Sequence, residues 1–140
     1  MNQIETTTII TVLNRAGLVG ALEGQAAVWA EALDDVRFED GREATRQMIR
    51  TRTSAERWVT PGDIRTLAKK VRLDRFNSLP FRLQHPELPQ PTTGEWNPRD
   101  EITFTRAYRD AVLDGKSPEI AYADACRAAH LPVTPLIEAA

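Results

Sequence analysis

The stretch SAERWVTPGDIRTLAKKVRLDRF, residues 54–76, contains the best-marked helix start in the chain. Thr60 is a typical N-cap residue, Pro61 suits the first helical position, and Asp63 completes a capping-box arrangement. Apolar residues then recur at helical spacing: Ile64, Leu67, Ala68 and Val71. Trp58 precedes the cap by two residues, and we expect it to fold back on this helix as a hydrophobic staple. The stretch therefore predicts an amphipathic helix that packs into a helical core.

Similar helical patterns lie on both sides of this stretch. Upstream, residues 4–16, 25–36 and 40–52 each carry an apolar stripe at helical spacing. Downstream, residues 97–132 form a helical hairpin, in which Asn97 and Ser117 each precede a proline at a helix start. The residues expected to face inward include Ile9, Leu13, Val28, Trp29, Leu33, Val36, Phe38, Ala44, Met48, Ile49, Ile102, Phe104, Tyr108, Ala111 and Val112.

The region between these two groups of helices is rich in proline and shows no periodicity, which predicts an extended linker. The expected organisation is a bundle of about four helices over 1–78, a linker over 79–97, a helical hairpin over 98–132 and a tail over 133–140. No strand pattern or internal repeat is present in the sequence. These patterns predict an all-α fold.

Length and composition restrict the class of protein. A chain of 140 residues holds one ordinary domain, or a small domain with an appendage. The single cysteine excludes an internal disulfide, which suits a reducing cytosol. No leader pattern is present, and no apolar run approaches the length of a membrane span. We therefore expect a soluble protein of the cytoplasm.

The net charge of −2 conceals an uneven distribution. Residues 1–41 carry two Arg against seven acids, residues 42–82 carry eleven Arg or Lys against four acids, and residues 83–140 carry five against nine. A basic middle between acidic ends is typical of a nucleic-acid or partner surface. Neutralisation of the blocks within the fold, or between copies of the chain, explains the pattern equally well.

The residues that could carry chemistry form no convincing catalytic set. Cys126 and His130 have the spacing of one helix face, but no third group is in place to orient them. Asp34, Asp35, Glu39 and Asp40 lack the spacing and the glycine of a calcium loop, and we expect a solvated acidic face. The chain has no phosphate-binding loop and too few Cys and His for a standard zinc site. We expect no cofactor and no enzymatic activity.

A nucleic-acid interface is one hypothesis that the residues themselves support, and a solvated basic face is the alternative. Basic residues gather on the exposed side of the helix over 61–75, and Arg42, Arg46 and Arg50 are near in sequence. The candidate phosphate contacts on that helix are Arg65, Lys69, Lys70, Arg72 and Arg75. A helix-turn-helix is compatible with the short turn before this helix, although Pro61 and Gly62 occupy the positions that would read bases.

The first 76 residues resemble the phage family of small helicase loaders and inhibitors. The resemblance is carried by a Trp-x-x-x-Leu helix and a turn made of an aromatic residue, proline, aspartate and isoleucine. In this sequence these residues are Trp29, Leu33, Trp58, Pro61, Asp63 and Ile64. The resemblance implies an N-terminal helical domain, a C-terminal part that contacts the bacterial replicative helicase, and a mechanism without catalysis. The chain departs from the family at its C-terminus, where a helical hairpin stands in place of a polar tail.

If the chain binds a helicase, the expected contact is an apolar face of the hairpin made by Phe104, Tyr108 and Tyr122. The alternative is that these rings are buried against the first domain. A third hypothesis, a self-associating regulatory scaffold, follows from the opposed charge blocks and predicts salt-sensitive homo-oligomers.

Overall fold

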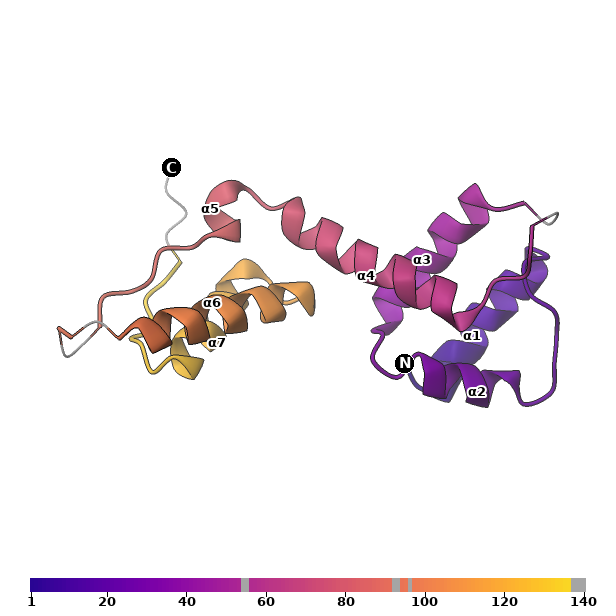
Figure 1. Ribbon diagram of the computed structural model, residues 1–140, viewed down its shortest axis with the longest axis horizontal. Coiled ribbons are helices and arrows are strands. Elements are labelled where there is room, and N and C mark those ends of the chain that lie inside the picture. Colours follow the sequence, from indigo (N-terminus) through magenta and orange to yellow (C-terminus); the bar gives the residue numbers. More distant parts are fainter. Residues whose placement is uncertain (54–55, 92–93, 96, 137–140) are drawn as a thin grey trace. The chain divides into compact units, whose positions relative to one another are not determined.

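The computed structural model describes residues 1–53, 56–91, 94–95 and 97–136 and is all-α, with no strand among these residues. Its helices are α1 (Gln3–Arg15), α2 (Gln25–Ala32), α3 (Phe38–Thr51), α4 (Pro61–Asn77), α5 (Phe81–Gln84), α6 (Pro98–Leu113) and α7 (Pro118–Ala128) (Figure 1). The predicted fold class is confirmed.

The chain divides into two compact units, Met1–Val71 (unit 1) and Arg72–Ala140 (unit 2). The division falls within α4, so this helix contributes to the core of both units. The sequence placed the end of the first domain at residue 78, after α4. The structure moves that boundary seven residues back, because Phe76 near the end of α4 belongs to the core of unit 2.

Unit 1 packs α1, α2, α3 and the first part of α4 around one apolar core. α1 contacts both α2 and α3. The core residues are Ile9, Leu13, Leu18, Val19, Trp29, Leu33, Val36, Ala44, Met48, Val59, Ile64 and Ala68. These helix faces and the 18–19 turn remove the core side chains from water, which is the main stabilising contribution to such a fold.

The helix starts that the sequence marks are present in the structure. The Thr60 hydroxyl accepts a hydrogen bond from the Asp63 N–H at 3.4 Å, and the Asp63 carboxylate accepts one from the Thr60 N–H at 2.8 Å. The Asn97 and Ser117 side chains cap α6 and α7, each before a proline. Each of these side chains binds an N–H group that has no partner within its helix.

Trp58 does not act as the predicted staple. Its side chain is 60% exposed and lies over Gly20, where an added Cβ would come within 2.6 Å of the indole ring. The neighbouring Val59 is buried instead, and its N–H bonds the Leu18 carbonyl at 2.9 Å. The chain before α4 therefore pairs with the 18–20 turn, and this pairing turns Trp58 to the surface.

Unit 2 is built on the α6–α7 hairpin, whose two helices make extensive contact. Its core consists of Phe76, Phe104, Tyr108, Ala111, Val112, Ala121, Tyr122, Ala125, Cys126, Ala129 and Leu131. The small residues of α7 allow α6 to approach closely. The Phe104 ring meets Tyr122 edge-on, with ring centroids 5.4 Å apart, a geometry that aromatic pairs favour.

Residues 79–91, which we call the strap, are not the free linker that the sequence predicts. The strap contains the short helix α5, and Leu79 and Leu88 pack against the hairpin core. Two hairpin hydroxyls donate to its carbonyls, Tyr108 to Leu83 and Tyr122 to Glu87. The prolines stop the segment from forming a long helix, but its apolar side chains still pack against the core of unit 2. Trp96 and residues 92–93 of the predicted linker lie outside the described residues.

Three apolar residues expected to face inward are exposed instead: Val28 is 65%, Ile49 37% and Ile102 59% exposed. Each lies beside its helix's buried stripe, which is narrower than the sequence pattern suggested. A helical pattern locates an apolar face but does not fix its width, because that depends on how many neighbours cover the helix.

Candidate functional site

The basic residues of α4 form the first candidate site, and Arg65 is the first of them. Its guanidinium donates to one Asp35 oxygen from Nε at 3.0 Å and from Nη2 at 2.8 Å, and Asp34 lies 3.9 Å away. The hydrogen bond from Arg65 lowers the pKa of the Asp35 carboxyl. Arg65 therefore neutralises the acids after α2.

Arg72 and Arg75 bind the C-terminal end of α6. Both donate to the Leu113 carbonyl, from Arg72 Nε at 3.3 Å and from Arg75 Nη1 at 2.8 Å, and Arg72 also pairs with Asp114 at 2.6 Å. The last carbonyls of a helix have no partner within the helix and carry the negative end of its dipole. Two arginines therefore stabilise this helix end, and their charges are used within unit 2.

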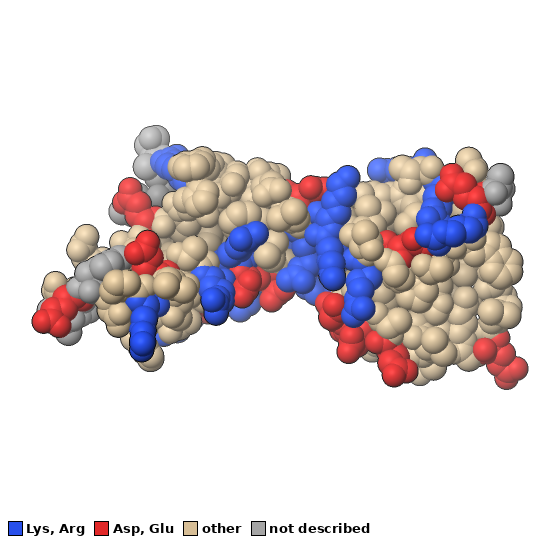
Figure 2. Space-filling view, viewed as in Figure 1, with Lys and Arg blue, Asp and Glu red and all other residues tan. Residues whose placement is uncertain are grey.

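Lys69 and Lys70 differ from the three arginines. Both are exposed, and no ion pair to either is present among the described residues. On α3, Arg46 pairs with Glu43 at 3.5 Å and Arg42 lies 6.0 Å from the centre of the Phe38 ring. Figure 2 shows that Lys and Arg gather over α4. Three of the five cations predicted as phosphate contacts are nevertheless engaged by the protein itself.

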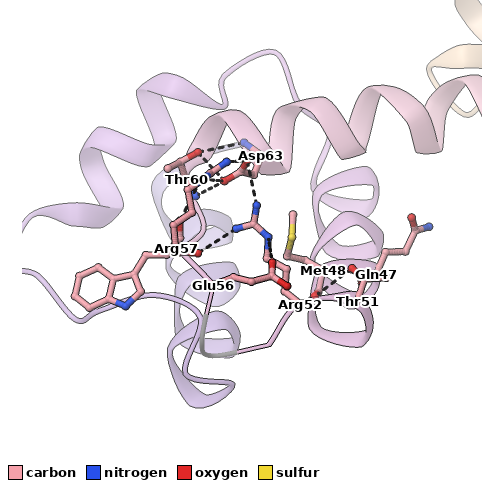
Figure 3. Close-up of polar contacts among 9 residues, drawn as sticks. Gln47, Met48, Thr51, Arg52, Glu56, Arg57, Thr60 and Asp63 are labelled. Carbon is pink, nitrogen blue, oxygen red and sulfur yellow. Dashed lines mark hydrogen bonds and ion pairs between the residues drawn. The ribbon is translucent and has the colours of Figure 1, made fainter.

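A second polar cluster surrounds Asp63 at the start of α4 (Figure 3). Arg57 donates to both carboxylate oxygens, at 2.7 and 2.8 Å, and Arg52 Nη2 lies 3.5 Å from one of them. The Thr60 hydroxyl adds a bond of 2.8 Å. These donors, Arg57 first, hold the pKa of Asp63 far below its usual range. The cluster fixes the entry to α4, and it satisfies the carboxylate so completely that no acid–base role remains for it.

The aromatic trio predicted to contact a partner is not exposed. Phe104, Tyr108 and Tyr122 are 1%, 2% and 5% exposed, so the prediction of an open apolar face is wrong. The rings are buried instead, in the core of unit 2, where they share a cluster with Phe76 of α4, a residue that the sequence assigned to the first domain, and with Leu79 and Leu88 of the strap. Burial raises the pKa of Tyr108 to about 12 and also raises that of Tyr122. The rings and the strap together form the second candidate site.

Cys126 and His130 do not share a helix face, contrary to their sequence spacing. α7 ends at Ala128, and His130 adopts the left-handed conformation with φ of 56°. Cys126 is fully buried, and burial raises the pKa of its thiol. Because a reactive cysteine needs an accessible thiolate, the environment of Cys126 is that of a small core residue.

The acidic residues after α2 do not form the continuous solvated face that the sequence predicts. Asp40 is fully buried at the start of α3, whereas Asp34, Asp35 and Glu39 are exposed. Across the described part of the chain, no group of three or more His, Cys, Asp or Glu residues is arranged to hold a metal ion.

Surface hollows are present on both units of the described chain. One, of about 500 Å³, lies between α1 and the 21–26 segment, and Glu23 is the one ionisable residue in its lining. The other, of about 540 Å³, is lined by α6 residues including Arg106 and Asp110. In the described ranges, no helix combines the length and the apolar character needed to cross a bilayer.

Comparison of the chain with family models, with curated proteins and with solved structures found no match.

Proposed function

We propose that the chain is a non-catalytic accessory protein of phage or prophage DNA replication that binds the bacterial replicative helicase in the cytoplasm and controls its loading. The observation that carries this proposal is the use of the α4 cations within the fold. Arg65, Arg72 and Arg75 bind Asp35, Leu113 and Asp114. Breaking these contacts would oppose phosphate binding by the same residues, which favours a protein partner over DNA.

The residues that carry the family resemblance support the same proposal. Trp29, Leu33 and Ile64 share the core of unit 1, and Pro61 and Asp63 begin α4. Trp58 also belongs to the resemblance but lies on the surface, 60% exposed. Exposed tryptophans are frequent among residues that dominate protein interfaces. As the resemblance implies, the mechanism is binding alone: the chain holds the helicase, suppresses its unproductive activity and releases it at the origin.

The proposal is tested by pull-down with the full chain against a panel of purified bacterial replicative helicases, in the presence of nuclease. We expect capture of a helicase, and we expect equal capture by the double variant Lys69→Glu/Lys70→Glu, which retains the three arginine contacts. Capture of no helicase, together with a salt-dependent DNA shift that the double variant loses, would overturn the proposal in favour of DNA binding. Light scattering at low and high salt tests the self-associating scaffold.

A further inference from the structure

The last turns of α4 are part of unit 2 and bind the C-terminal end of its hairpin helix α6. The Leu113 carbonyl at this end accepts hydrogen bonds from Arg72 Nε at 3.3 Å and from Arg75 Nη1 at 2.8 Å. The Phe76 ring is 8% exposed and belongs to the core of unit 2, where the Arg109 guanidinium lies 5.6 Å from its centre. The end of α4 therefore supplies unit 2 with one core side chain and with the cations that cap α6.

The first turns of the same helix are held in unit 1. Ile64 and Ala68 are 0% and 1% exposed and belong to the core of that unit. The Asp63 carboxylate accepts two hydrogen bonds from Arg57, at 2.7 and 2.8 Å. Helix α4 therefore begins in the core of one unit and ends in the core of the other.

No interruption separates these two parts of α4. The helix runs from Pro61 to Asn77 as one element, and after Gly62 its sequence contains neither glycine nor proline. Because each N–H group of an α-helix bonds the carbonyl four residues before it, the N–H groups of residues 72–75 bond the carbonyls of residues 68–71. The former belong to unit 2 and the latter to unit 1. The backbone hydrogen bonds of α4 therefore cross the boundary between the units.

We propose that α4 couples the stability of the two units, so that the contacts of its end in unit 2 stabilise unit 1, and the reverse. Helix formation is cooperative, and a helix shorter than about 12 residues is marginal in water without support. The part of α4 in unit 1, residues 61–71, falls below that length, and the part in unit 2, residues 72–77, is shorter still. Each part therefore gains support from the continuation of the helix in the other unit.

This coupling gives the fold a means of regulation. A partner that binds only the folded form of unit 1 stabilises unit 2 as well, and by thermodynamic linkage a partner of unit 2 stabilises unit 1. The exposed Trp58 precedes α4 directly, so a partner bound there acts on the first turn of the shared helix. The inference goes beyond the proposed function, because it holds for any partner of either unit.

Native-state hydrogen exchange on the full chain tests the coupling with the variant Phe76→Ala, which removes the core side chain that α4 gives to unit 2. We expect the amides of Leu13 and Met48, both in unit 1, to exchange at least about fivefold faster, the effect of one lost hydrogen bond. The matched control is Leu73→Ala, on the same helix and 42% exposed, which should change these rates less than about twofold. Alanine forms helices more readily than phenylalanine, so helix propensity alone predicts the opposite result, slower exchange.

Wild-type exchange of the unit 1 amides in Phe76→Ala would overturn the proposal even if unit 2 unfolds, because uncoupled units respond separately. Equal acceleration by Leu73→Ala would also contradict it, since the effect would not come from the Phe76 contact. In the reciprocal variant Leu13→Ala, the amides of Val112 and Ala125 in unit 2 should exchange faster than in the wild-type chain, and unchanged rates there would again refute the coupling. None of these results depends on helicase binding, so failure here and failure of the proposed function are distinguishable.

Discussion

Replacement of Asp63 by asparagine tests the reasoning about the start of α4. The variant removes the charge of a side chain that is 15% exposed and keeps its size. Hydrogen bonds to a charged acceptor contribute about 1 kcal/mol more than those to a neutral one, and a negative charge in the first turn contributes about 0.5 kcal/mol. The asparagine would weaken the two Thr60 bonds and would lose the interaction of the charge with the helix dipole. Because solvent screens part of both effects, we expect the free energy of unfolding at pH 7 to fall by about 1.5 kcal/mol.

The pH dependence follows from the direction of the pKa shift. The folded-state pKa of Asp63 lies below the unfolded value of about 3.9. The contribution of the carboxylate is therefore present in full above about pH 4 and is lost as the pH falls towards the folded-state pKa. The difference between wild type and Asp63→Asn should be constant from pH 7 to pH 5 and should shrink below pH 4.

Urea unfolding at several pH values, followed by tryptophan fluorescence, measures this difference, because Trp29 is buried in unit 1. The matched control is Asp74→Asn, an exposed residue on the same helix with no ion pair among the described residues. We expect that control to change stability by less than about 0.5 kcal/mol. A difference for Asp63→Asn that persists unchanged at pH 3 would refute the electrostatic explanation, and no loss at pH 7 would refute the cap itself.

Three further predictions concern the contact of Gly20 with Trp58 and the cores of the two units. Gly20→Ala should displace the Trp58 ring, because the new Cβ would lie 2.6 Å from it, and iodide quenching of tryptophan fluorescence should therefore increase. The free energy of unfolding should fall by less than about 1 kcal/mol, because the exposed ring can move into solvent. Leu13→Ala, at a fully buried position, should destabilise unit 1 by about 3 kcal/mol in urea unfolding, and a loss below 1 kcal/mol would contradict its place in the core. Tyr108 should ionise near pH 12 by absorbance at 295 nm. Because its pKa is higher in the folded state, stability should fall as the pH rises from about 10 towards 12. Tyr108→Phe should reduce that dependence and leave the part that comes from Tyr122 and Cys126, whose pKa values are also raised.

Local sequence signals were sufficient to locate most helices. The Thr60–Asp63 capping box, Asn97 and Ser117 all cap helices as expected. Capping depends on residues within three positions of one another, so the sequence contains all the information needed. The helix α5 was not predicted, because four residues give too few positions to show a period.

The candidate sites were less predictable, because they depend on partners distant in sequence. The sequence identified the cations of α4, but only the structure pairs Arg65 with Asp35, 30 residues away, and Arg72 with Asp114, 42 residues away. The aromatic residues of the hairpin were recognised as an apolar face, but nothing in their spacing indicates that residues 79–91 cover them. An apolar stripe reveals which side of a helix avoids water, and not which segment provides the cover.

The sequence by itself determined the all-α class, the helix starts and the presence of two groups of helices, since these follow from short-range periodicity and capping. Only the tertiary structure decided where the units divide, because Phe76 is drawn into the second core and places the boundary inside α4. The tertiary structure also decided which arginines form ion pairs within the protein and which aromatic rings are buried. A guanidinium or a phenol is compatible with a surface or a buried role, and the choice depends on whether an acceptor from a distant part of the chain lies within hydrogen-bonding reach.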